Sequence, residues 1–323
     1  MNRIAVWGAG YLGAALIVNP HFQKNNVIVA MVDSNHALHG ETRNQIEISP
    51  PSVLGSIDFD YVVIAAEKYE AEITEQLIRL GVPMNKIIRS SVIGFFNKDR
   101  TVFRNRIMAE SLSNYTVKQM DDLIDRSEYA SDYIRYASFW LVVEEIKKRQ
   151  LCGSVAELGV WRGRFASLIN LAFPEAKLYL FDTFEGFDER DLTFDMNNSY
   201  ISGHGSSNSF FDLMRDTSIK EVMARMPYPD QCVIKKGYFP ESLEGLEDTF
   251  CFVSLDVDLY LPMKAGLEYF YPRMVKGGVI FIHDYSSDET LAGVKAAVTE
   301  FCEANQIMLV PIPDEGGTAI IIR

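Results

Sequence analysis

Two short clusters of metal-ligating side chains follow apolar, strand-like runs in the last third of the chain. Asp256 comes directly after the run that ends at Leu255, and His283 with Asp284 comes directly after the run that ends at Ile282. In open α/β sheets the carboxyl ends of neighbouring parallel strands face the crevice that binds ligands. Carboxylate oxygens in such a crevice suit Mg²⁺ or a similar divalent cation. The pattern therefore predicts a metal site at this edge of a parallel sheet.

An acidic residue and a glycine-containing turn mark a second candidate site upstream. Glu157 ends an apolar run, and Gly159 and Gly163 lie in the turn before a helix-like segment, so a ligand can approach the backbone closely there. Asp182 closes the next apolar run, at the position where such folds hold the hydroxyl pair of a ribose. The sequence contains no P-loop. These features favour a neutral or cationic nucleoside ligand over a nucleoside triphosphate.

Six sequence blocks in this part of the chain resemble the macrocin O-methyltransferase family. In order, the blocks are 157–163, 182–187, 237–239, 255–260, 271–278 and 284–285. Members of that family are metal-dependent enzymes that use S-adenosylmethionine to methylate sugar hydroxyls. The resemblance runs from about Tyr133 to the C-terminus. It implies a class I S-adenosylmethionine-dependent methyltransferase domain and a sugar acceptor, either a small molecule or a glycan.

The same resemblance implies a contact for each part of the cofactor and of the metal. The cofactor contacts are Glu157, Gly159 and Gly163 beneath the methionine part, Asp182 and Thr183 at the ribose, and Gly237 and Tyr238 near the adenine. Asp256 is implied to be a metal ligand and the candidate general base. Asp284 is implied to be the second of two adjacent acidic ligands.

Position 283 departs from the family pattern, which usually has two aspartates before the tyrosine, whereas this chain has His283 and Asp284. Three interpretations stay open. As a neutral ligand, His283 shifts the preference of the site from Mg²⁺ toward Mn²⁺, Fe²⁺, Co²⁺ or Zn²⁺. As a catalytic base with an ordinary pKa near 6.5, roughly, it needs no metal. In the third interpretation the protein is an inactive methyltransferase fold whose N-terminal domain binds a nucleotide or a nucleotide sugar.

A glycine fingerprint opens the chain. Gly8, Gly10 and Gly13 follow a strand-like run and precede a helix-like one, and Asp33 ends the next strand-like run. Every element of the dinucleotide-binding pattern is present. This predicts a small Rossmann-like domain, which resembles the short domains at the front of polysaccharide-biosynthesis proteins and sugar acyltransferases. Its ligand is a nucleotide or nucleotide sugar, NAD(P) used in redox chemistry, or none, in which case the domain serves packing or dimerisation.

The alternation of apolar runs predicts two doubly wound α/β domains. Residues 1–97 should form the Rossmann-like domain, 98–132 a helical connector and 133–323 the methyltransferase domain. Within the first domain we expect a buried strand at 61–66 and a helix over 70–80 that stops at a glycine.

The apolar spacing over 117–150 predicts one or two helices that lead into the second domain. The family resemblance implies that Tyr133 and Arg135 face the cofactor, whereas a solvated helix face is the preferred interpretation for Arg135. A last strand at 318–322 should return as a hairpin next to the edge of the sheet. Asp258 is expected to be structural, as a cap for a helix that begins near Pro262.

The stretch 188–230 is polar and is predicted to be an irregular lid over cofactor and acceptor. Its His204 is expected to be an exposed loop residue.

Composition narrows the class of partner. The net charge is −13 and the longest basic cluster is 147–149, which excludes a nucleic-acid footprint and disfavours anionic membrane surfaces. There is no run of 18 apolar residues and no leader-like N-terminus, so membrane insertion is not expected. The four cysteines are scattered, which suits a reducing compartment. We expect a cytoplasmic enzyme that forms a homo-oligomer.

Overall fold

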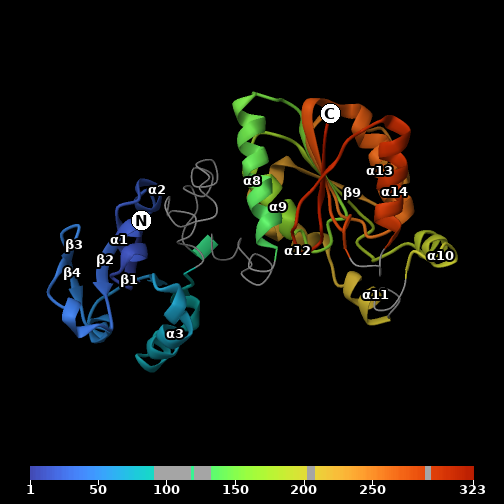
Figure 1. The fold of residues 1–323 in the computed structure, drawn as a ribbon. Helices are drawn as coiled ribbons and strands as arrows, with labels where there is room; N and C mark the ends of the chain where they lie inside the picture. Colours follow the sequence, from blue (N-terminus) through green and yellow to red (C-terminus); the bar gives the residue numbers. More distant parts are fainter. Residues whose placement is uncertain (91–117, 120–131, 202–207, 288–291) are drawn as a thin grey trace. The chain divides into compact units, whose positions relative to one another are not determined.

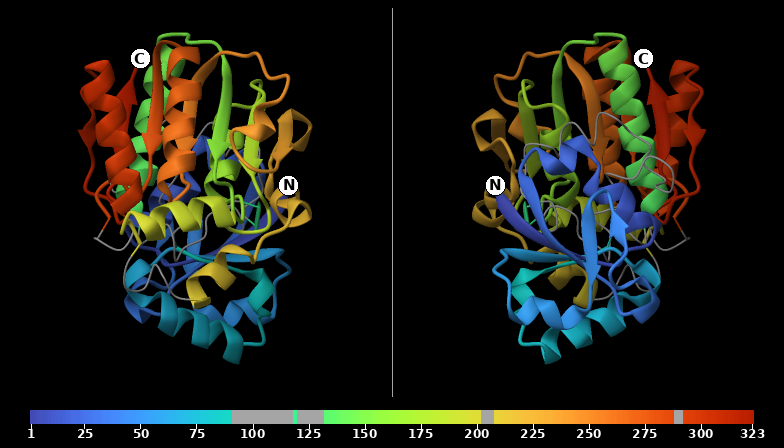
Figure 2. Two further views of the ribbon diagram at one scale, coloured as in Figure 1. Left: turned by 90° about the vertical axis from the view of Figure 1, so that its right-hand side faces the viewer. Right: turned by 90° about the vertical axis from the view of Figure 1, so that its left-hand side faces the viewer.

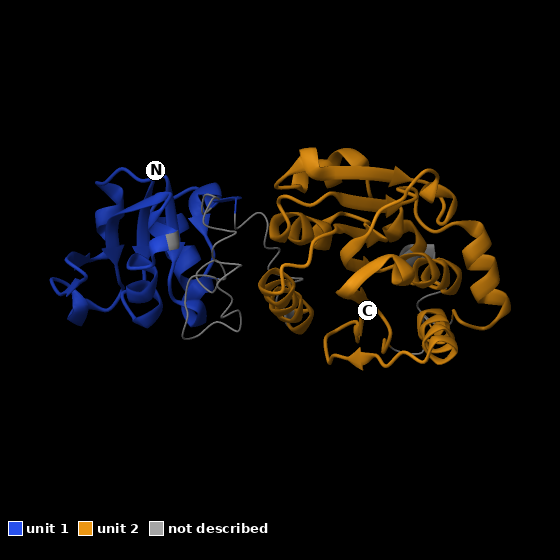
Figure 3. Ribbon diagram, turned by 90° about the horizontal axis from the view of Figure 1, so that it is seen from above, with its two compact units in different colours: residues 1–126 blue, residues 127–323 orange. Residues whose placement is uncertain are grey.

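The computed structural model describes residues 1–90, 118–119, 132–201, 208–287 and 292–323 (Figure 1). The chain divides into two compact units, Met1–Arg126 and Ser127–Arg323 (Figure 3). The predicted connector at 98–132 lies almost entirely outside the described residues, as does His204. The domain boundaries predicted at 97 and 133 therefore stay predictions.

The first unit is built on one largely parallel sheet with the strand order β3-β4-β2-β1-β5-β6. Its strands are β1 (Asn2–Trp7), β2 (Asn26–Val32), β3 (Thr42–Arg43), β4 (Ile46–Ser49), β5 (Tyr61–Ile64) and β6 (Ile87–Ile88). Its α-helices are α1 (Tyr11–Ile17), α2 (Pro20–Gln23) and α3 (Glu70–Arg79). The five strands from β4 to β6 are parallel, and their order is that of a dinucleotide-binding half-fold. The strand and the helix predicted in this unit are both confirmed.

The second unit holds a seven-stranded sheet with the order β12-β13-β11-β10-β7-β8-β9. Its strands are β7 (Ser154–Leu158), β8 (Leu178–Asp182), β9 (Cys232–Lys236), β10 (Phe250–Leu255), β11 (Met274–Ile282), β12 (Val310–Pro311) and β13 (Ala319–Ile322). The strands from β11 to β9 run parallel, whereas β13 is antiparallel to β11. The predicted last strand is thus confirmed, one position in from the edge.

Helices cover both faces of this second sheet. α8 (Tyr133–Lys148) and α9 (Arg164–Ala172) lie on one face, and α13 (Tyr260–Arg273) and α14 (Ala292–Asn305) lie on the other (Figures 1 and 2). None of the helices in the described part of the chain is both long and apolar enough to cross a bilayer. The expected doubly wound α/β architecture is confirmed for this unit.

A bulge in β10 lets its phenylalanines pack on opposite faces of the sheet. The register of β10 shifts between Phe250 and Phe252 against both neighbouring strands. Side chains two apart in a regular strand share a face, and an extra residue breaks that rule. Phe250 consequently packs against Phe270 of α13 with ring centroids 5.1 Å apart, while Phe252 packs against Phe139 of α8 at 5.1 Å. This central strand carries Asp256 at its carboxyl end.

The stretch 188–230 is largely helical, so the prediction of an irregular lid was wrong in its local structure. It contains α10 (Glu189–Asn197), α11 (Asn208–Met214) and α12 (Ile219–Arg225). Two of these helices begin at side-chain caps: Asp188 accepts a hydrogen bond from the backbone of Arg190, and Ser218 accepts one from Glu221. The same polar residues that suggested a loop are preferred helix caps.

Helix α13 begins at Tyr260, and its first backbone N–H groups are not capped by Asp258. The Tyr260 N–H instead donates to both carboxylate oxygens of Asp195 in α10, at 3.3 and 3.1 Å. The cap predicted for Asp258 was therefore wrong. A carboxylate distant in the sequence takes the capping role, and local spacing does not reveal it.

The capping carboxyl group makes stability depend on pH in a definite direction. Burial raises the pKa of Asp195 from its ordinary 3.8 to about 6, against the opposing effect of the Tyr260 N–H. Between about pH 4 and pH 6 the folded state therefore holds a proton that the unfolded chain releases. The free energy of unfolding falls as the pH rises through this window, by at most about 1.4 kcal/mol per pH unit for one proton.

We expect Asp195→Asn, which keeps an oxygen acceptor for Tyr260 but does not titrate, to remove this part of the slope. Urea unfolding of the wild type and the variant at pH 4, 5, 6 and 7 measures it. The exposed Asp230→Asn is the matched control and should keep the wild-type slope. The prediction is contradicted if the free energy of unfolding changes with pH in the same way in Asp195→Asn as in the wild type.

Candidate active site

The loops after β7 and β10 touch at a glycine. Gly159 has a φ of +87°, and a Cβ atom built on it lies 1.8 Å from the carbonyl oxygen of Asp256. The backbone N–H of Asp256 in turn donates to the carbonyl of Leu158 at 2.8 Å. Only a residue without a side chain fits here. The glycine therefore brings the Asp256 loop against the turn that follows β7.

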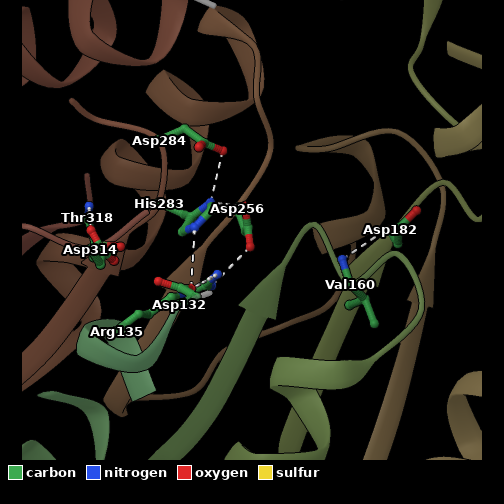
Figure 4. A network of polar contacts seen from close by, with 9 residues as sticks. All are labelled: Asp132, Arg135, Val160, Asp182, Asp256, His283, Asp284, Asp314 and Thr318. Carbon is green, nitrogen blue, oxygen red and sulfur yellow. Dashed lines mark hydrogen bonds and ion pairs between the residues drawn. The ribbon is translucent and has the colours of Figure 1, made fainter. Parts of the chain in front are cut away.

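Asp182 holds the turn after β7 in place. Its Oδ2 accepts hydrogen bonds from the backbone N–H groups of Val160 and Trp161, both at 2.8 Å, and its Oδ1 accepts one from Phe184 at 2.7 Å (Figure 4 shows the contact with Val160). Asp182 is thus a loop anchor that joins the ends of β7 and β8. Its predicted contact with a ribose stays a prediction.

A cleft of about 630 Å³ lies above these strand ends. Five of the residues predicted to bind the cofactor line it: Gly159, Asp182, Thr183, Gly237 and Tyr238. The Tyr238 hydroxyl donates to Asp191 at 3.0 Å, and the Arg190 guanidinium lies 3.5 Å from the centre of the Tyr238 ring. We name this space the first cleft.

Two of the predicted cofactor residues lie elsewhere. Gly163 precedes α9 with a φ of +71°, and a Cβ there would lie 2.9 Å from Val222 and 3.1 Å from Met226. Glu157 is not among the residues that line the first cleft, and it lines a second one.

The second cleft has an empty volume of about 1060 Å³ and is rich in charged side chains. Its charged residues are Asp132, Arg135, Glu157, Arg164, Asp256, Asp258, His283, Asp284 and Glu315. Gly159, Trp161, Met214, Asp256 and Asp258 line both clefts. A ligand in each cleft would therefore meet the other at Asp256 and Asp258.

The predicted metal residues lie together at the ends of β10 and β11. The parallel register pairs Leu255 with Ile282, which sets Asp256 beside His283. His283 Nδ1 lies 3.0 Å from Asp256 Oδ1 and 2.9 Å from Asp284 Oδ2 (Figure 4). The pairing of β10 with β11 thus brings residues that are distant in the sequence into one compact cluster of possible metal ligands.

Arg135 of α8 is buried in this cluster, so its predicted place on a solvated face was wrong. Its side chain is 7% exposed. Its Nη2 donates to Asp256 Oδ2 at 2.9 Å, and its guanidinium carbon lies 4.2 Å from the centre of the Phe165 ring. α8 is apolar around most of its circumference, so the apolar spacing alone does not single out its outer face. The side chain of Tyr133 lies outside the described part of α8.

The buried charges set the proton affinities of the cluster. Burial raises the pKa of Asp256, but His283 and Arg135 outweigh it and hold that pKa well below its usual range. Burial and Arg135 lower the pKa of His283, but the charges of Asp256 and Asp284 outweigh them and raise it well above 6.5. Asp256 is therefore a weak proton acceptor, and His283 holds its proton more firmly than a free imidazole does.

Two other carboxyl groups in the second cleft hold protons more firmly. Burial, followed by the charges of Asp284 and Asp256, raises the pKa of Asp258 well above its ordinary value. Burial and Asp256 do the same for Glu157, against the opposing charge of Arg135. Glu157 is 2% exposed, and its Oε2 has no hydrogen-bond partner among the described residues.

The donor cluster fits a divalent metal ion in chemistry and in size. One nitrogen and two oxygens from Asp256, His283 and Asp284 converge within 4.8 Å of one another. An imidazole and two carboxylates form a ligand set that several first-row divalent ions accept. The excess of buried carboxylates around it favours a bound cation.

In the first unit the glycine fingerprint is explained largely by packing. A Cβ on Gly8 would lie 2.8 Å from the carbonyl oxygen of Ala65, and one on Gly13 would lie 1.9 Å from that of Gly8. Gly10 faces open space, with no atom within 4 Å of its Cβ position in the described structure. Asp33 Oδ2 accepts a hydrogen bond from the backbone of Ala9 at 2.8 Å. The predicted nucleotide or NAD(P) ligand of this unit stays a prediction.

The family model described as Macrocin-O-methyltransferase (TylF) matches residues 118–319, well over half of the chain. The chain belongs to the macrocin O-methyltransferase family. All residues predicted for the cofactor and metal sites of the second unit lie within the matched range. A second family model, described as C2185-like, N-terminal, matches residues 1–88 of this family member.

Solved structures similar to this macrocin O-methyltransferase family member include other methyltransferases. The O-methyltransferase NovP is 22% identical over 58% of this chain and 79% of its own, with a TM-score of 0.48. The calicheamicin methyltransferase CalS11 is 18% identical over 80% of this chain and 93% of its own, with a TM-score of 0.44. UDP-D-quinovosamine 4-dehydrogenase from Vibrio fischeri is 22% identical over 27% of this chain and 76% of its own, with a TM-score of 0.24. No curated protein matches the chain.

Sequence reasoning missed Asp132 as a residue of the site and preferred other roles for Arg135 and Asp258. Asp258 stood two residues after Asp256, in a stretch that was assigned to a strand and a helix cap, but β10 ends at Leu255 and Asp258 has a φ of +61°. Asp132 and Arg135 stand on or beside α8, far from the strand ends in sequence. An arginine in the mostly apolar first half of α8 was the available signal.

The contact between the two loops predicts the effect of a single methyl group. An alanine in a left-handed backbone conformation costs about 1–2 kcal/mol. We expect Gly159→Ala to lower the free energy of unfolding by more than this amount. The additional cost comes from the overlap with the Asp256 carbonyl. Gly245→Ala is the matched control, since Gly245 also has a positive φ (+72°) but faces open space. Equal destabilisation of the two variants in urea unfolding contradicts the close approach.

Proposed function

We propose that the protein is an S-adenosylmethionine-dependent O-methyltransferase that methylates a sugar hydroxyl with the help of a divalent metal ion. The observation that carries the proposal is that the two clefts meet at Asp256 and Asp258. One cleft is lined by the predicted cofactor residues and the other by the predicted metal residues. Such an arrangement sets a methyl donor and a hydroxyl acceptor against one another in line, which supplies much of the rate gain in a transfer of this kind.

The first cleft suits the cofactor, which would supply an electrophilic methyl group on sulfonium sulfur. Asp182 offers a carboxylate to the ribose hydroxyls while it holds the turn after β7. Tyr238, fixed by Asp191 and Arg190, offers a flat face to the adenine. Glu157 has an unpartnered buried oxygen next to this turn and is suited to the ammonium group of the methionine part.

Asp256, His283 and Asp284 would hold the metal ion, which would lower the pKa of a sugar hydroxyl bound to it. Arg135 keeps one oxygen of Asp256 occupied and leaves Oδ1 directed at His283.

Asp258 is the group best suited to take the proton from the sugar hydroxyl. It lines both clefts, whereas the two oxygens of Asp256 contact Arg135 and His283. The base roles predicted for Asp256 and His283 stay predictions. In the alternative, an inactive methyltransferase fold, no residue acts as a base. That alternative does not explain why the two clefts meet at Asp256 and Asp258.

Calorimetric titration with S-adenosylmethionine and S-adenosylhomocysteine, with and without Mg²⁺ or Mn²⁺, tests the proposal. We expect Asp182→Ala to lose cofactor binding, because it removes both the ribose contact and the anchor of the turn. Asp256→Ala and Asp258→Asn should bind the cofactor as the wild type does.

Turnover is measured as formation of S-adenosylhomocysteine with a panel of nucleotide sugars. Loss of the base in Asp258→Asn should slow it by about 10²- to 10⁴-fold. Asp248→Asn, at the opposite ends of the strands, is the matched control. The proposal is wrong if neither ligand binds the wild type under any condition, and the placement of the ribose is wrong if Asp182→Ala binds normally.

A further inference from the structure

We propose that Asp132 is a positioning residue that turns His283 into a nitrogen ligand, so that the site selects Mn²⁺ and similar ions over Mg²⁺. The inference rests on the proposed metal-assisted function. It adds the identity of the ion and names the residue that determines it by positioning the His283 ring. Its starting point is that carboxylates flank both nitrogens of the His283 ring. Those on the Nδ1 side are the predicted metal ligands Asp256 and Asp284.

The other side of the ring faces Asp132 and Asp314, which together with His283 form a second group of possible metal ligands. Asp132 Oδ2 lies 3.9 Å from His283 Nε2, and an oxygen of Asp314 completes a group within 4.8 Å (Figure 4). Asp132 is 8% exposed, and its Oδ1 has no hydrogen-bond partner in the described part of the chain. A small rotation of either side chain closes the gap to a hydrogen bond and satisfies a buried oxygen, which is costly to leave unpaired.

The main chain crowds the Nε2 side of the ring, which favours the Nδ1 side for the metal ion. A Cβ built on Gly316 would lie 2.3 Å from His283 Nε2 and 2.5 Å from Cε1, so the main chain of this loop lies directly against the ring. The loop is held by Thr318 N–H, which donates to Asp314 Oδ1 at 2.5 Å. In the proposed arrangement the ring edge that carries Nε2 donates its hydrogen to Asp132, and Nδ1 is left for the metal.

Arg135 ties this arrangement to the rest of the site. It contacts Asp132 at 3.7 Å and Asp256 at 2.9 Å, one carboxylate on each side of the imidazole. A ligating histidine commonly donates its other N–H to a carboxylate, which fixes the tautomer and the ring orientation. Asp132, Arg135 and Gly316 together provide that support here.

The consequence is a change of metal preference. Mg²⁺ is a hard ion that favours oxygen ligands and octahedral geometry, whereas Mn²⁺, Fe²⁺, Co²⁺ and Zn²⁺ accept imidazole nitrogen. A site in which one of three protein donors is a positioned nitrogen therefore favours the second group. The presence of Gly316 beneath the ring indicates that the loop is shaped for a histidine at this position.

Metal binding to the full-length protein tests the inference without any sugar acceptor. Mg²⁺ and Mn²⁺ are titrated calorimetrically into wild type, His283→Asp, Asp132→Asn and the control Asp248→Asn. Wild type should bind Mn²⁺ more tightly than Mg²⁺, and His283→Asp should lose most of that difference. Asp132→Asn should weaken Mn²⁺ binding by about 10- to 100-fold. The control should match the wild type.

A spectroscopic signature separates positioning from a general structural effect. Electron spin-echo envelope modulation of bound Mn²⁺ should show coupling to a directly bound imidazole nitrogen in the wild type, no such coupling in His283→Asp, and a reduced one in Asp132→Asn. Gly316→Ala should weaken Mn²⁺ binding in the wild type and have a smaller effect in the His283→Asp background, where the ring is gone.

Equal affinities for Mg²⁺ and Mn²⁺ in the wild type, or Mn²⁺ bound without nitrogen coupling, overturn the inference. So does an Asp132→Asn variant with wild-type Mn²⁺ affinity and coupling. Failure of S-adenosylmethionine to bind is a separate result, because it contradicts the proposed function whatever the metal titrations show. A protein that binds the cofactor but neither metal keeps the methyltransferase assignment and rejects the metal site.

Discussion

Buried negative charge at the carboxyl ends of β7, β10 and β11 is the constraint on which the arrangement of the site depends. Carboxylates removed from water must be paired, protonated or bound to a cation. Here Arg135 pairs with Asp256, while Asp258 and Glu157 hold protons more firmly than usual. His283 lies between the carboxylates of Asp256 and Asp284, with its Nδ1 within about 3 Å of both. The helix that supplies Arg135 is therefore as much a part of the site as the strands that supply the acids.

In each of the two units an aspartate at the end of one strand accepts backbone hydrogen bonds from the turn that follows the neighbouring strand. Asp33 follows β2 and binds the backbone of the glycine turn after β1, and Asp182 ends β8 and binds the turn after β7. In both cases an acid at the end of one strand fixes the loop after its neighbour. A carboxylate so placed keeps a turn in the shape a ligand requires before any ligand arrives, which reduces the ordering cost of binding.

Much of the fold and part of the site could be predicted from local patterns. Apolar runs closed by Asp182, Asp256 and His283 indicated parallel strands, and Gly159 indicated a close approach of backbones; both follow from short-range geometry. The misplaced residues share a different cause. Asp195 caps a helix far along the chain, and Arg135 reaches its partner across 121 positions. Such pairings depend on which helix packs over which strand end.

The sequence by itself determined the strands that carry the site, the glycine turns and the acids at the strand ends, because these depend on backbone sterics and on the two-residue period of a strand. Only the tertiary structure decided which of those acids share a cleft, which are neutralised, and which ring nitrogen of His283 faces Asp256 and Asp284. The register of β10 against β11 sets the distance between Asp256 and His283. The packing of α8 and of the Gly316 loop sets their charge environment, and neither is encoded in any one segment.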